Sequence, residues 1–197
     1  MQAMVQRSKS ENWPCEFVKV ISNKPQAAGL AWAAQRQIDT AVIAHQDYGT
    51  REAFDECLAQ TIDEAKPDYV LLAGFMRILT TAFVKHYEGR LINIHPSLLP
   101  AFAGLKTHEQ ALAAGVGWHG CTVHFVTDQL DLGPIIAQAA LPVRRGQSAS
   151  DLADRVLAME HQLYPQVLKW LCEGRVSLKH GKAQIEGVPY PHLWQAP

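Results

Sequence analysis

The sequence carries little net charge and few cysteines, and each shortage excludes a class of function. The 18 basic and 19 acidic residues give a formal net charge of -1, which argues against a protein that coats nucleic acid or binds anionic membranes. The four cysteines lie far apart without a C-x-x-C pair, so reduced structural thiols are expected. None of the nine histidines has H-E-x-x-H spacing, and no metal site is expected.

Long apolar runs are also missing. No stretch approaches the roughly 18 residues that a membrane span needs, and the opening MQAMVQRSKSENWP lacks the apolar core of a signal peptide. We therefore expect a cytoplasmic protein that acts on small molecules, not on nucleic acid or membranes. No G-x-G-x-x-G follows a strand pattern, which disfavours a nucleotide-binding dehydrogenase. The 197 residues, 48% of them hydrophobic, suffice for one domain with a sizeable core.

Short apolar runs alternate with helical patterns along the chain. Strands are predicted over 16–22, 40–45, 68–75 and the run ending at Asn93, and helices over 26–37, 50–66, 80–86 and 107–115. This alternation favours an α/β fold with a mostly parallel central sheet flanked by helices. Ligands bind such sheets beyond the carboxyl ends of the strands, so residues that follow a strand are the first candidates for chemistry.

The second half has a different pattern. GCTVHFVTD (120–128) and GPIIAQAALPV (133–143) predict two strands close enough to form an antiparallel pair. A long helix is predicted from Ser148, where S-A-S-D resembles a capping box, to Leu171. Pro165 is expected to kink this helix or end its regular part. The tail, SLKHGKAQIEGVPYPHLW, predicts a small hairpin followed by an irregular end.

The stretch RLINIHPSLLP (90–100) carries the best candidates for chemistry. Asn93 and His95 are two apart at the end of an apolar run, so both side chains point to the same side of a strand. Imidazole suits proton transfer near neutral pH, although the two residues could equally be a hydrogen-bonded loop pair. Asp131 lies between the two later strands, where it could orient His95. Asp128 is its competitor, and Asp-Leu-Gly turns are more often structural than catalytic.

Other charged residues have weaker support from the sequence. Arg77 directly follows a predicted strand, and Arg51 opens a helix where its charge opposes the helix dipole. Either arginine could pair with a ligand carboxylate or simply be solvated. Glu160, in the middle of the long helix, is more often part of a solvated face. The remaining histidines considered, expected to be surface or packing residues, are His108, His119 and His161.

Two segments together resemble the folate-dependent formyltransferases, in their phosphoribosylglycinamide formyltransferase branch. They are LAGFMRILTTAFVKHYEGRLINIHPSLLPAFAGLKTH and HGCTVHFVTDQLDLGPIIAQ. N-x-H-P-S-L-L-P with a downstream D-x-G-P-I is specific to that family, and GFMRIL and TVHFV indicate the branch. The resemblance covers nearly the whole chain and is strongest over 69–143. It implies a Rossmann-like formyltransferase domain over 1–197, with a nucleotide-binding half (1–95) and a folate-binding half (96–197) that includes the C-terminal helix and hairpin.

The resemblance also implies an activity in purine synthesis. The formyl group of 10-formyltetrahydrofolate, a co-substrate, passes to the amine of glycinamide ribonucleotide, without a metal, in a monomer or weak homodimer. The family's catalytic trio maps onto Asn93, His95 and Asp131. Asn93 and protonated His95 would donate hydrogen bonds to the oxyanion of a tetrahedral intermediate, and Asp131 would favour the imidazolium.

Further roles are carried over from the same resemblance. The residues implied to bind folate are Arg51, Met76, Arg77, Ile78, Leu79, Asn93, Val126, Thr127, Asp128 and Asp131. Glu160 is implied to contact the ribose of the nucleotide, and His124, on a strand facing the site, to support the trio. Leu157 lies where some members carry a polar or basic contact, so that contact is expected to be absent.

The chain departs from the family at its start. Members open with a strand and a Gly-rich G-x-G-S-N loop that cradles the nucleotide phosphate, whereas MQAMVQRS resembles the helix that follows this loop. An N-terminally truncated domain is therefore expected, with backbone groups left unpaired near the centre of the sheet. Two other functions remain open, a formyltetrahydrofolate deformylase with water as acceptor and an inactive folate-binding remnant. The near-neutral charge disfavours methionyl-tRNA formyltransferase.

Overall fold

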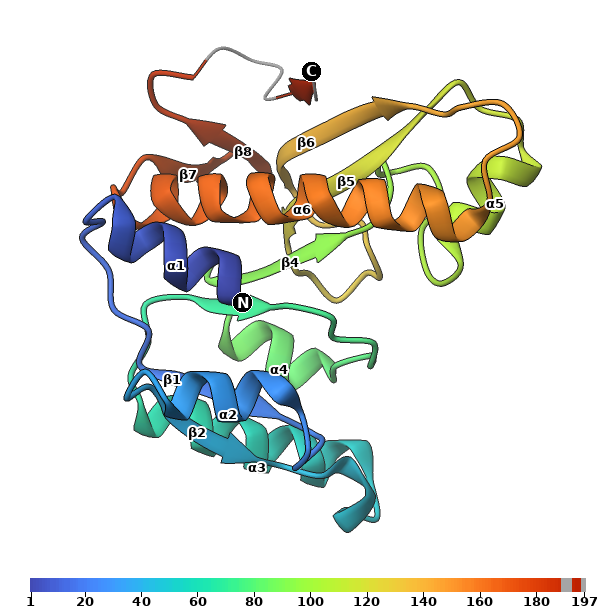
Figure 1. The fold of residues 1–197 in the computed structure, drawn as a ribbon. Coiled ribbons are helices and arrows are strands. Elements are labelled where there is room, and N and C mark those ends of the chain that lie inside the picture. Colours follow the sequence, from blue (N-terminus) through green and yellow to red (C-terminus); the bar gives the residue numbers. More distant parts are fainter. Residues whose placement is uncertain (189–192, 196–197) are drawn as a thin grey trace.

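The computed structural model describes residues 1–188 and 193–195, and the strands of these residues form three separate sheets (Figure 1). The first sheet pairs β1 (Lys19–Ser22) in parallel with β2 (Asp39–Val42). The largest sheet has the order β3 (Val70–Leu72), β4 (Leu91–His95), β5 (Trp118–Phe125), β6 (Ile135–Pro142) and β9 (Leu193–Gln195). The third is the hairpin of β7 (Val176–Lys179) and β8 (Lys182–Ile185).

The helices begin close to the predicted positions. They are α1 (Gln2–Ser10), α2 (Ala28–Ala34), α3 (Arg51–Glu64), α4 (Thr81–His86), α5 (Thr107–Ala113) and α6 (Ala149–Cys172), with a short 3-10 turn at His45–Asp47. Thr50 caps α3 by accepting the Ala53 N–H, and Ser148 and Asp151 form the predicted capping box of α6. α6 reaches Cys172, one residue beyond the predicted end at Leu171. Of the two effects expected of Pro165, a kink or an end of the regular helix, the second is wrong, because the helix continues through that residue.

The large sheet is mixed, and its composition confirms the predicted fold class. β3 pairs with β4 in parallel, as does β6 with β9, whereas β4–β5 and β5–β6 are antiparallel. The predicted antiparallel pair of the second half is therefore β5 and β6. The predicted hairpin of the tail is also present. The irregular end expected after it falls in part on 189–192 and 196–197, which lie outside the described residues.

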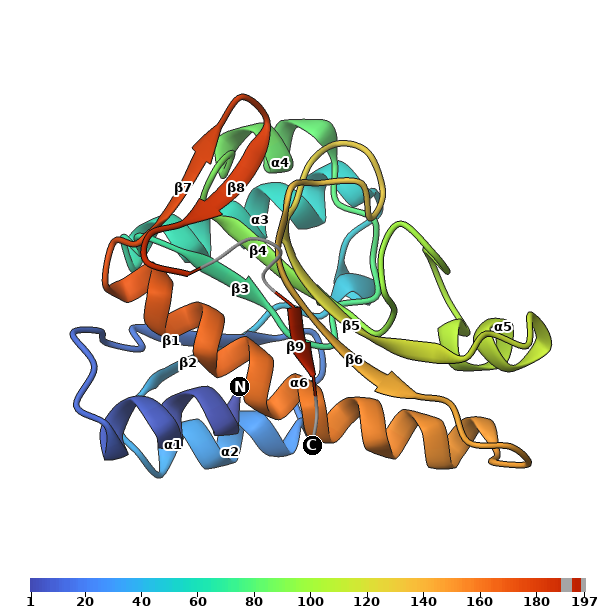
Figure 2. The same cartoon turned by 90° about the horizontal axis from the view of Figure 1, so that it is seen from above.

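The main core lies between α6 and the antiparallel part of the large sheet. Leu152, Val156 and Leu163 of α6 are fully buried, as are Val123 of β5 and Ile136 of β6. Helix α1 lies beside α6 (Figures 1 and 2). Polar contacts join the two at the C-terminal end of α1, where Arg7 donates to Gln166 and Glu11 accepts from Lys169. None of the helices in the described ranges has the length and apolarity needed to cross a membrane.

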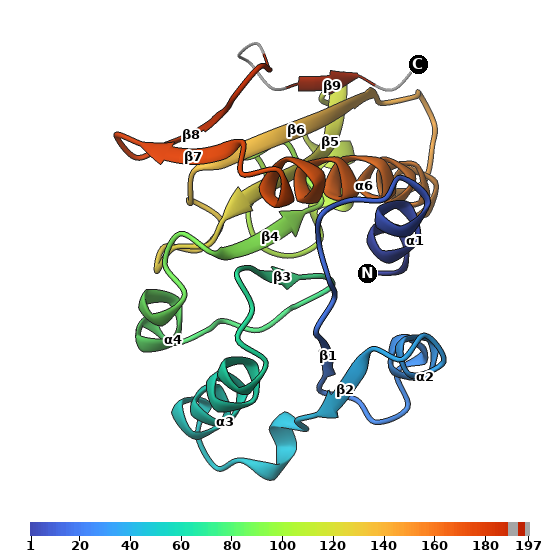
Figure 3. The same cartoon turned by 90° about the vertical axis from the view of Figure 1, so that its left-hand side faces the viewer.

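A cleft separates the β1–β2 sheet from the large sheet. It has a volume of about 1180 Å³ and is lined by residues of both β1 and β3. Figure 3 shows the ribbons of β1 and β2 set apart from those of β3 and β4. Smaller apolar clusters flank it. One, beneath α3 and α4, contains Phe54, Leu58 and Tyr87, and another contains Val5 and Ala33. Asn93, His95 and Asp131 do not line this cleft, so it is not where the sequence analysis places the chemistry.

Candidate active site

Strand β4 presents Asn93 and His95 on one side of the sheet, opposite two residues of β5. Asn93 pairs in register with His124, and its Nδ2 lies 3.3 Å from the His124 Nε2. The His124 Nδ1 lies 2.9 Å from the carbonyl oxygen of Phe125, which can only accept, so Nδ1 carries the proton and Nε2 accepts from Asn93. Burial lowers the pKa of His124, which keeps this ring neutral. The Asn93 amide is thereby oriented with a second N–H left over.

His95 lies between two oxygen acceptors. Its Nε2 is 3.0 Å from the Phe102 carbonyl oxygen, and its Nδ1 is 3.5 Å from the Asp131 Oδ2. The side chains of His95 and Asp131 are each only 8% exposed. Because both ring nitrogens face oxygens, the doubly protonated imidazolium is the form that can donate on both sides. The separation of 3.5 Å is long for a hydrogen bond, so Asp131 acts on the ring mainly through its charge.

The Asp-Leu-Gly turn holds Asp131 at this position. Asp131 has a φ of 53°, in the left-handed region, and its Oδ2 accepts the N–H of Gly104 at 2.9 Å. Two residues on, a Cβ at Gly133 would overlap the carbonyl oxygen of Phe125, so only glycine fits there. Through its bond to Gly104, Asp131 joins its own turn to the loop that follows β4. The same carboxylate also faces His95.

Buried side chains also fix the loop that follows His95. The Thr122 Oγ1 donates to the Ser97 carbonyl at 2.6 Å and accepts the Leu99 N–H at 3.0 Å, and the Gln138 Nε2 donates to the Leu99 carbonyl at 2.9 Å. The sequence analysis missed this network. It also missed the backbone groups of Phe102 and Gly104, because their contribution does not depend on side-chain identity.

The predicted folate loops expose apolar side chains at the edge of the sheet. Met76 and Ile78, in the loop after β3, are 83% and 62% exposed, and Leu130 and Leu132, beside Asp131, are 58% and 60% exposed. Apolar side chains gathered in solvent are typical of binding surfaces.

The remaining predicted folate residues are distributed between packing and solvent. Leu79 and Val126 pack against the cluster beneath α3 and α4. Thr127 donates its hydroxyl to the Gln129 carbonyl, and Asp128 is exposed. The Arg77 guanidinium carbon lies 5.1 Å from the centre of the Phe54 ring, and Arg51 is exposed, 3.9 Å from Glu52. Both arginines therefore lie at α3 and neither contacts the trio in this ligand-free structure.

Comparison with known proteins identifies the family. The sequence model of the family described as formyl transferase matches residues 1–168, most of the chain. The chain belongs to the formyl transferase family. It is 47% identical to the phosphoribosylglycinamide formyltransferase of Escherichia coli (strain K12) over 191 residues, which cover 97% of this chain and 90% of that protein. The family predicted from the sequence is confirmed, as is a formyltransferase enzyme.

Two further proteins are similar to this formyl transferase. The Bos taurus trifunctional purine biosynthetic protein adenosine-3 is 45% identical over 178 residues, which are 90% of this chain but only 18% of that larger protein. The solved structure of a phosphoribosylglycinamide formyltransferase from Coxiella burnetii in complex with CHES superposes with a TM-score of 0.90 at 44% identity, covering 98% of this chain and 92% of that one.

Glu160 of this formyl transferase lies apart from the trio, on α6. Desolvation by burial raises its pKa from a usual value of 4.5 to about 7. Its charge lies close enough to Cys121 of β5 to help raise the pKa of that thiol, although burial is the larger cause. A carboxylate that burial makes costly to ionise is typical of a functional position. The expectation that Glu160 belongs to a solvated face of α6 is therefore the weaker one.

The variant Glu160→Gln is expected to be more stable than the wild type at alkaline pH. Because the folded-state pKa exceeds the unfolded one, the folded protein binds more protons between pH 4.5 and about 7, and wild-type stability falls as pH rises through that window. Across this window the wild type is expected to lose about 2 kcal/mol of unfolding free energy, after a discount for the partial exposure of Glu160. Thermal unfolding at about pH 4.5 and about pH 8.5 should show the variant's advantage only at the higher pH. Glu56→Gln, on the exposed face of α3, is the control, and an equal gain there would contradict the assignment.

The other histidines divide as the sequence analysis expected, into surface and packing positions. His119 is fully buried, its ring packs against Phe102, and burial lowers its pKa to about 4. The Nδ1 of His108 lies 3.2 Å from the Nε2 of His119. His161 is exposed on α6. Within the described ranges, no group of three or more histidine, cysteine, aspartate or glutamate side chains is arranged to hold a metal ion.

Proposed function

We propose that this chain transfers the formyl group of 10-formyltetrahydrofolate to the amine of glycinamide ribonucleotide, a step of purine synthesis. The observation that carries the proposal is the buried contact of 3.5 Å between His95 and Asp131, next to the oriented amide of Asn93. The E. coli relative, 47% identical, is named for the same activity. Small molecules are the only partners that this reaction requires.

The reaction is a direct attack. The amine nitrogen of the nucleotide bonds to the formyl carbon, and the carbonyl electron pair moves onto oxygen. When the tetrahedral intermediate collapses, the bond from that carbon to the folate nitrogen breaks, and the proton lost by the amine passes to the departing nitrogen. The negative oxygen needs hydrogen-bond donors that are already in place, each typically contributing about 3 kcal/mol to lowering the barrier.

Asn93 and His95 supply these donors. His124 holds one Asn93 N–H, so the second N–H is free to donate to the oxyanion. The His95 Nε2–H, which donates to the Phe102 carbonyl in the ligand-free protein, would exchange that acceptor for the more strongly charged oxyanion. Asp131 stabilises the imidazolium, so that His95 can donate and also give up a proton to the leaving nitrogen.

The surrounding loops suit the folate. Met76 to Leu79 and Val126 to Asp131 would enclose the pterin between exposed apolar side chains. Arg51 and Arg77, both at α3, would hold the carboxylate tail, a pairing that guanidinium groups favour. Glu160, once ionised, would accept hydrogen bonds from the ribose hydroxyls. These roles do not divide at residue 95, because Arg51 and Arg77 lie before it and Glu160 lies after it. Both halves of a cytoplasmic enzyme would then contribute to holding the two substrates.

A spectrophotometric assay tests the proposal. The purified chain is mixed with 10-formyltetrahydrofolate, and release of tetrahydrofolate is followed by absorbance with and without glycinamide ribonucleotide. Turnover that requires the nucleotide is the expected result. Equal turnover without it would identify a deformylase, because water then accepts the formyl group. No turnover under either condition, with folate binding intact by calorimetry, would identify a binding remnant. Either of the last two results rejects the transferase.

A further inference from the structure

The loop between β3 and α4 has a solvent side and a protein side. Met76 and Ile78 are 83% and 62% exposed, whereas Arg77 and Leu79, which alternate with them, are partly buried. The two exposed apolar side chains are free to meet a ligand. The two partly buried side chains must then hold the loop in place, so its anchoring decides where the exposed ones lie.

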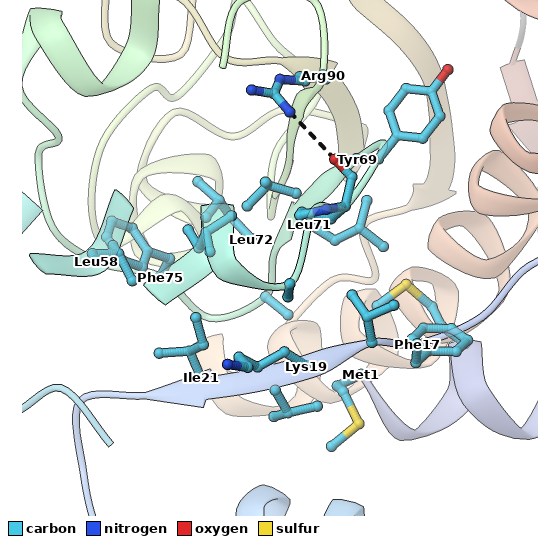
Figure 4. A pocket seen from close by; sticks show the side chains of 18 of the residues that line it. Met1, Phe17, Lys19, Ile21, Leu58, Tyr69, Leu71, Leu72, Phe75 and Arg90 are labelled. Atoms are coloured by element: carbon cyan, nitrogen blue, oxygen red, sulfur yellow. Dashed lines mark hydrogen bonds between the residues drawn. The ribbon is translucent and has the colours of Figure 1, made fainter. Parts of the chain in front are cut away.

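The protein side of this loop packs on α3. The Arg77 guanidinium carbon lies 5.1 Å from the centre of the Phe54 ring, and Leu79 packs against the apolar cluster that contains Phe54. Figure 4 shows Phe75, the residue before this loop segment, at the same end of the cleft as Leu58 of α3. Apolar contacts are not directional, so they hold the loop close to α3 without determining its exact position along the helix.

A directional contact holds the end of the loop. The Asp55 Oδ2 accepts the backbone N–H of Thr80 at 2.6 Å, a short distance that is typical of a bond to a charged acceptor. Asp55 is only 3% exposed and Thr80 only 9%, so little water reaches this bond. Thr80 is also the N-cap of α4, where its Oγ1 accepts the Phe83 N–H at 3.3 Å. A carboxylate of α3 therefore sets the point at which the loop ends and α4 begins.

The packing of α3 does not by itself explain a carboxylate at this position. Phe54, Leu58 and Ile62 form the buried apolar face of the helix, and Asp55 is buried beside them. Burial of a carboxylate is costly unless it is hydrogen-bonded, and alanine is the better helix former. The bond to Thr80 supplies the compensation, so the carboxylate serves the loop and not the helix that carries it.

We propose that Asp55 is a positioning residue for folate binding, because it holds Thr80 and with it the docked conformation of the loop over 76–79. The inference rests on the proposed function, in which this loop encloses the pterin. When only a fraction of the molecules has the loop docked, the apparent affinity for the ligand falls by that fraction. Loss of Asp55 therefore weakens folate binding, whereas the chemical step, which belongs to the trio on other segments, is retained.

The variant Asp55→Ala tests the proposal. Its dissociation constant for tetrahydrofolate, the unreactive product, is measured by calorimetry and is expected to rise about tenfold. The KM for 10-formyltetrahydrofolate should rise in parallel, whereas kcat under saturation with both substrates should change by less than about threefold. A merely structural role would instead lower the active fraction, and so the measured kcat, without changing the affinity of the molecules that remain folded.

Two further variants control for the hydrogen bond and for stability. Asp55→Asn keeps an oxygen that can accept the Thr80 N–H and should recover most of the lost affinity. Ile62→Ala removes a buried side chain from the same helix, about two turns further along α3. It should lower the midpoint of thermal unfolding without weakening the binding of tetrahydrofolate.

Two results would overturn the proposal while leaving the proposed function intact. One is unchanged affinity for tetrahydrofolate in a folded Asp55→Ala protein, which would show that the loop needs no carboxylate. The other is an equal loss of affinity in Ile62→Ala, which would show that general destabilisation of α3 is the cause. Failure of the proposed function gives a different result, because the wild type itself would then bind no tetrahydrofolate, and this inference would be rejected with it.

Discussion

The variant His95→Ala is expected to turn over at least about a thousandfold more slowly than the wild type, because it loses an oxyanion donor and the proton-transfer group together. Folate affinity should change only a few-fold. The surfaces proposed to hold the pterin and the carboxylate tail belong to other segments, with Met76 exposed after β3 and Arg77 beside Phe54. The fall should therefore be found in kcat, measured under saturation, and not in the dissociation constant measured by calorimetry.

A matched control separates chemistry from folding in this experiment. His161→Ala removes an exposed imidazole from α6 and should retain full activity. The His95 side chain is 8% exposed and contacts Phe102, so the thermal unfolding of the variant must be compared with that of the wild type. A well-folded His95→Ala protein that keeps more than about a tenth of the wild-type kcat would reject His95 as an oxyanion donor, since removal of one such donor typically costs 10²–10³ in rate.

The sequence predicted the position of Asn93 and His95 from local rules. A run of apolar residues that ends before prolines is a strong sign of a strand exit, and the i, i+2 spacing settles that the two side chains share a side. Their register with His124 and Thr122 then depends on β5, which pairs with β4 across roughly thirty intervening residues. From the residues alone Asp131 was one of two candidates, beside Asp128, and the family resemblance favoured it, because a turn of Asp-Leu-Gly looks the same whether or not a histidine lies opposite.

The ends of strands were predicted less well, and the cleft explains part of the error. The apolar patterns over 16–22 and 68–75 predicted longer strands than β1 (Lys19–Ser22) and β3 (Val70–Leu72). Within the part of the chain that the structure describes, each of these strands has a neighbour on one side only, so fewer ladder hydrogen bonds hold its ends. Hydrophobic pattern reports which residues suit a buried strand, but a strand forms only as far as a partner pairs with it.

Conversion of Asp131 to asparagine is expected to reduce kcat by about a hundredfold. Asparagine tolerates the left-handed conformation with φ of 53°, and its side-chain oxygen can still accept the Gly104 N–H. The turn should therefore keep its shape while the negative charge beside His95 is lost. Without that charge His95 loses its electrostatic partner in the transition state, so the fall should be found in kcat.

Asp154→Asn, which removes an exposed carboxylate from α6, is the matched control and should leave the rate unchanged. The measurements are kcat and the midpoint of thermal unfolding for all three proteins. If Asp131→Asn lowered both together, Asp131 would act by holding the loop around Gly104 and not by its charge. If neither quantity changed, the contact of 3.5 Å with His95 would have no catalytic role, and the imidazole would have to work from its interaction with the Phe102 carbonyl alone.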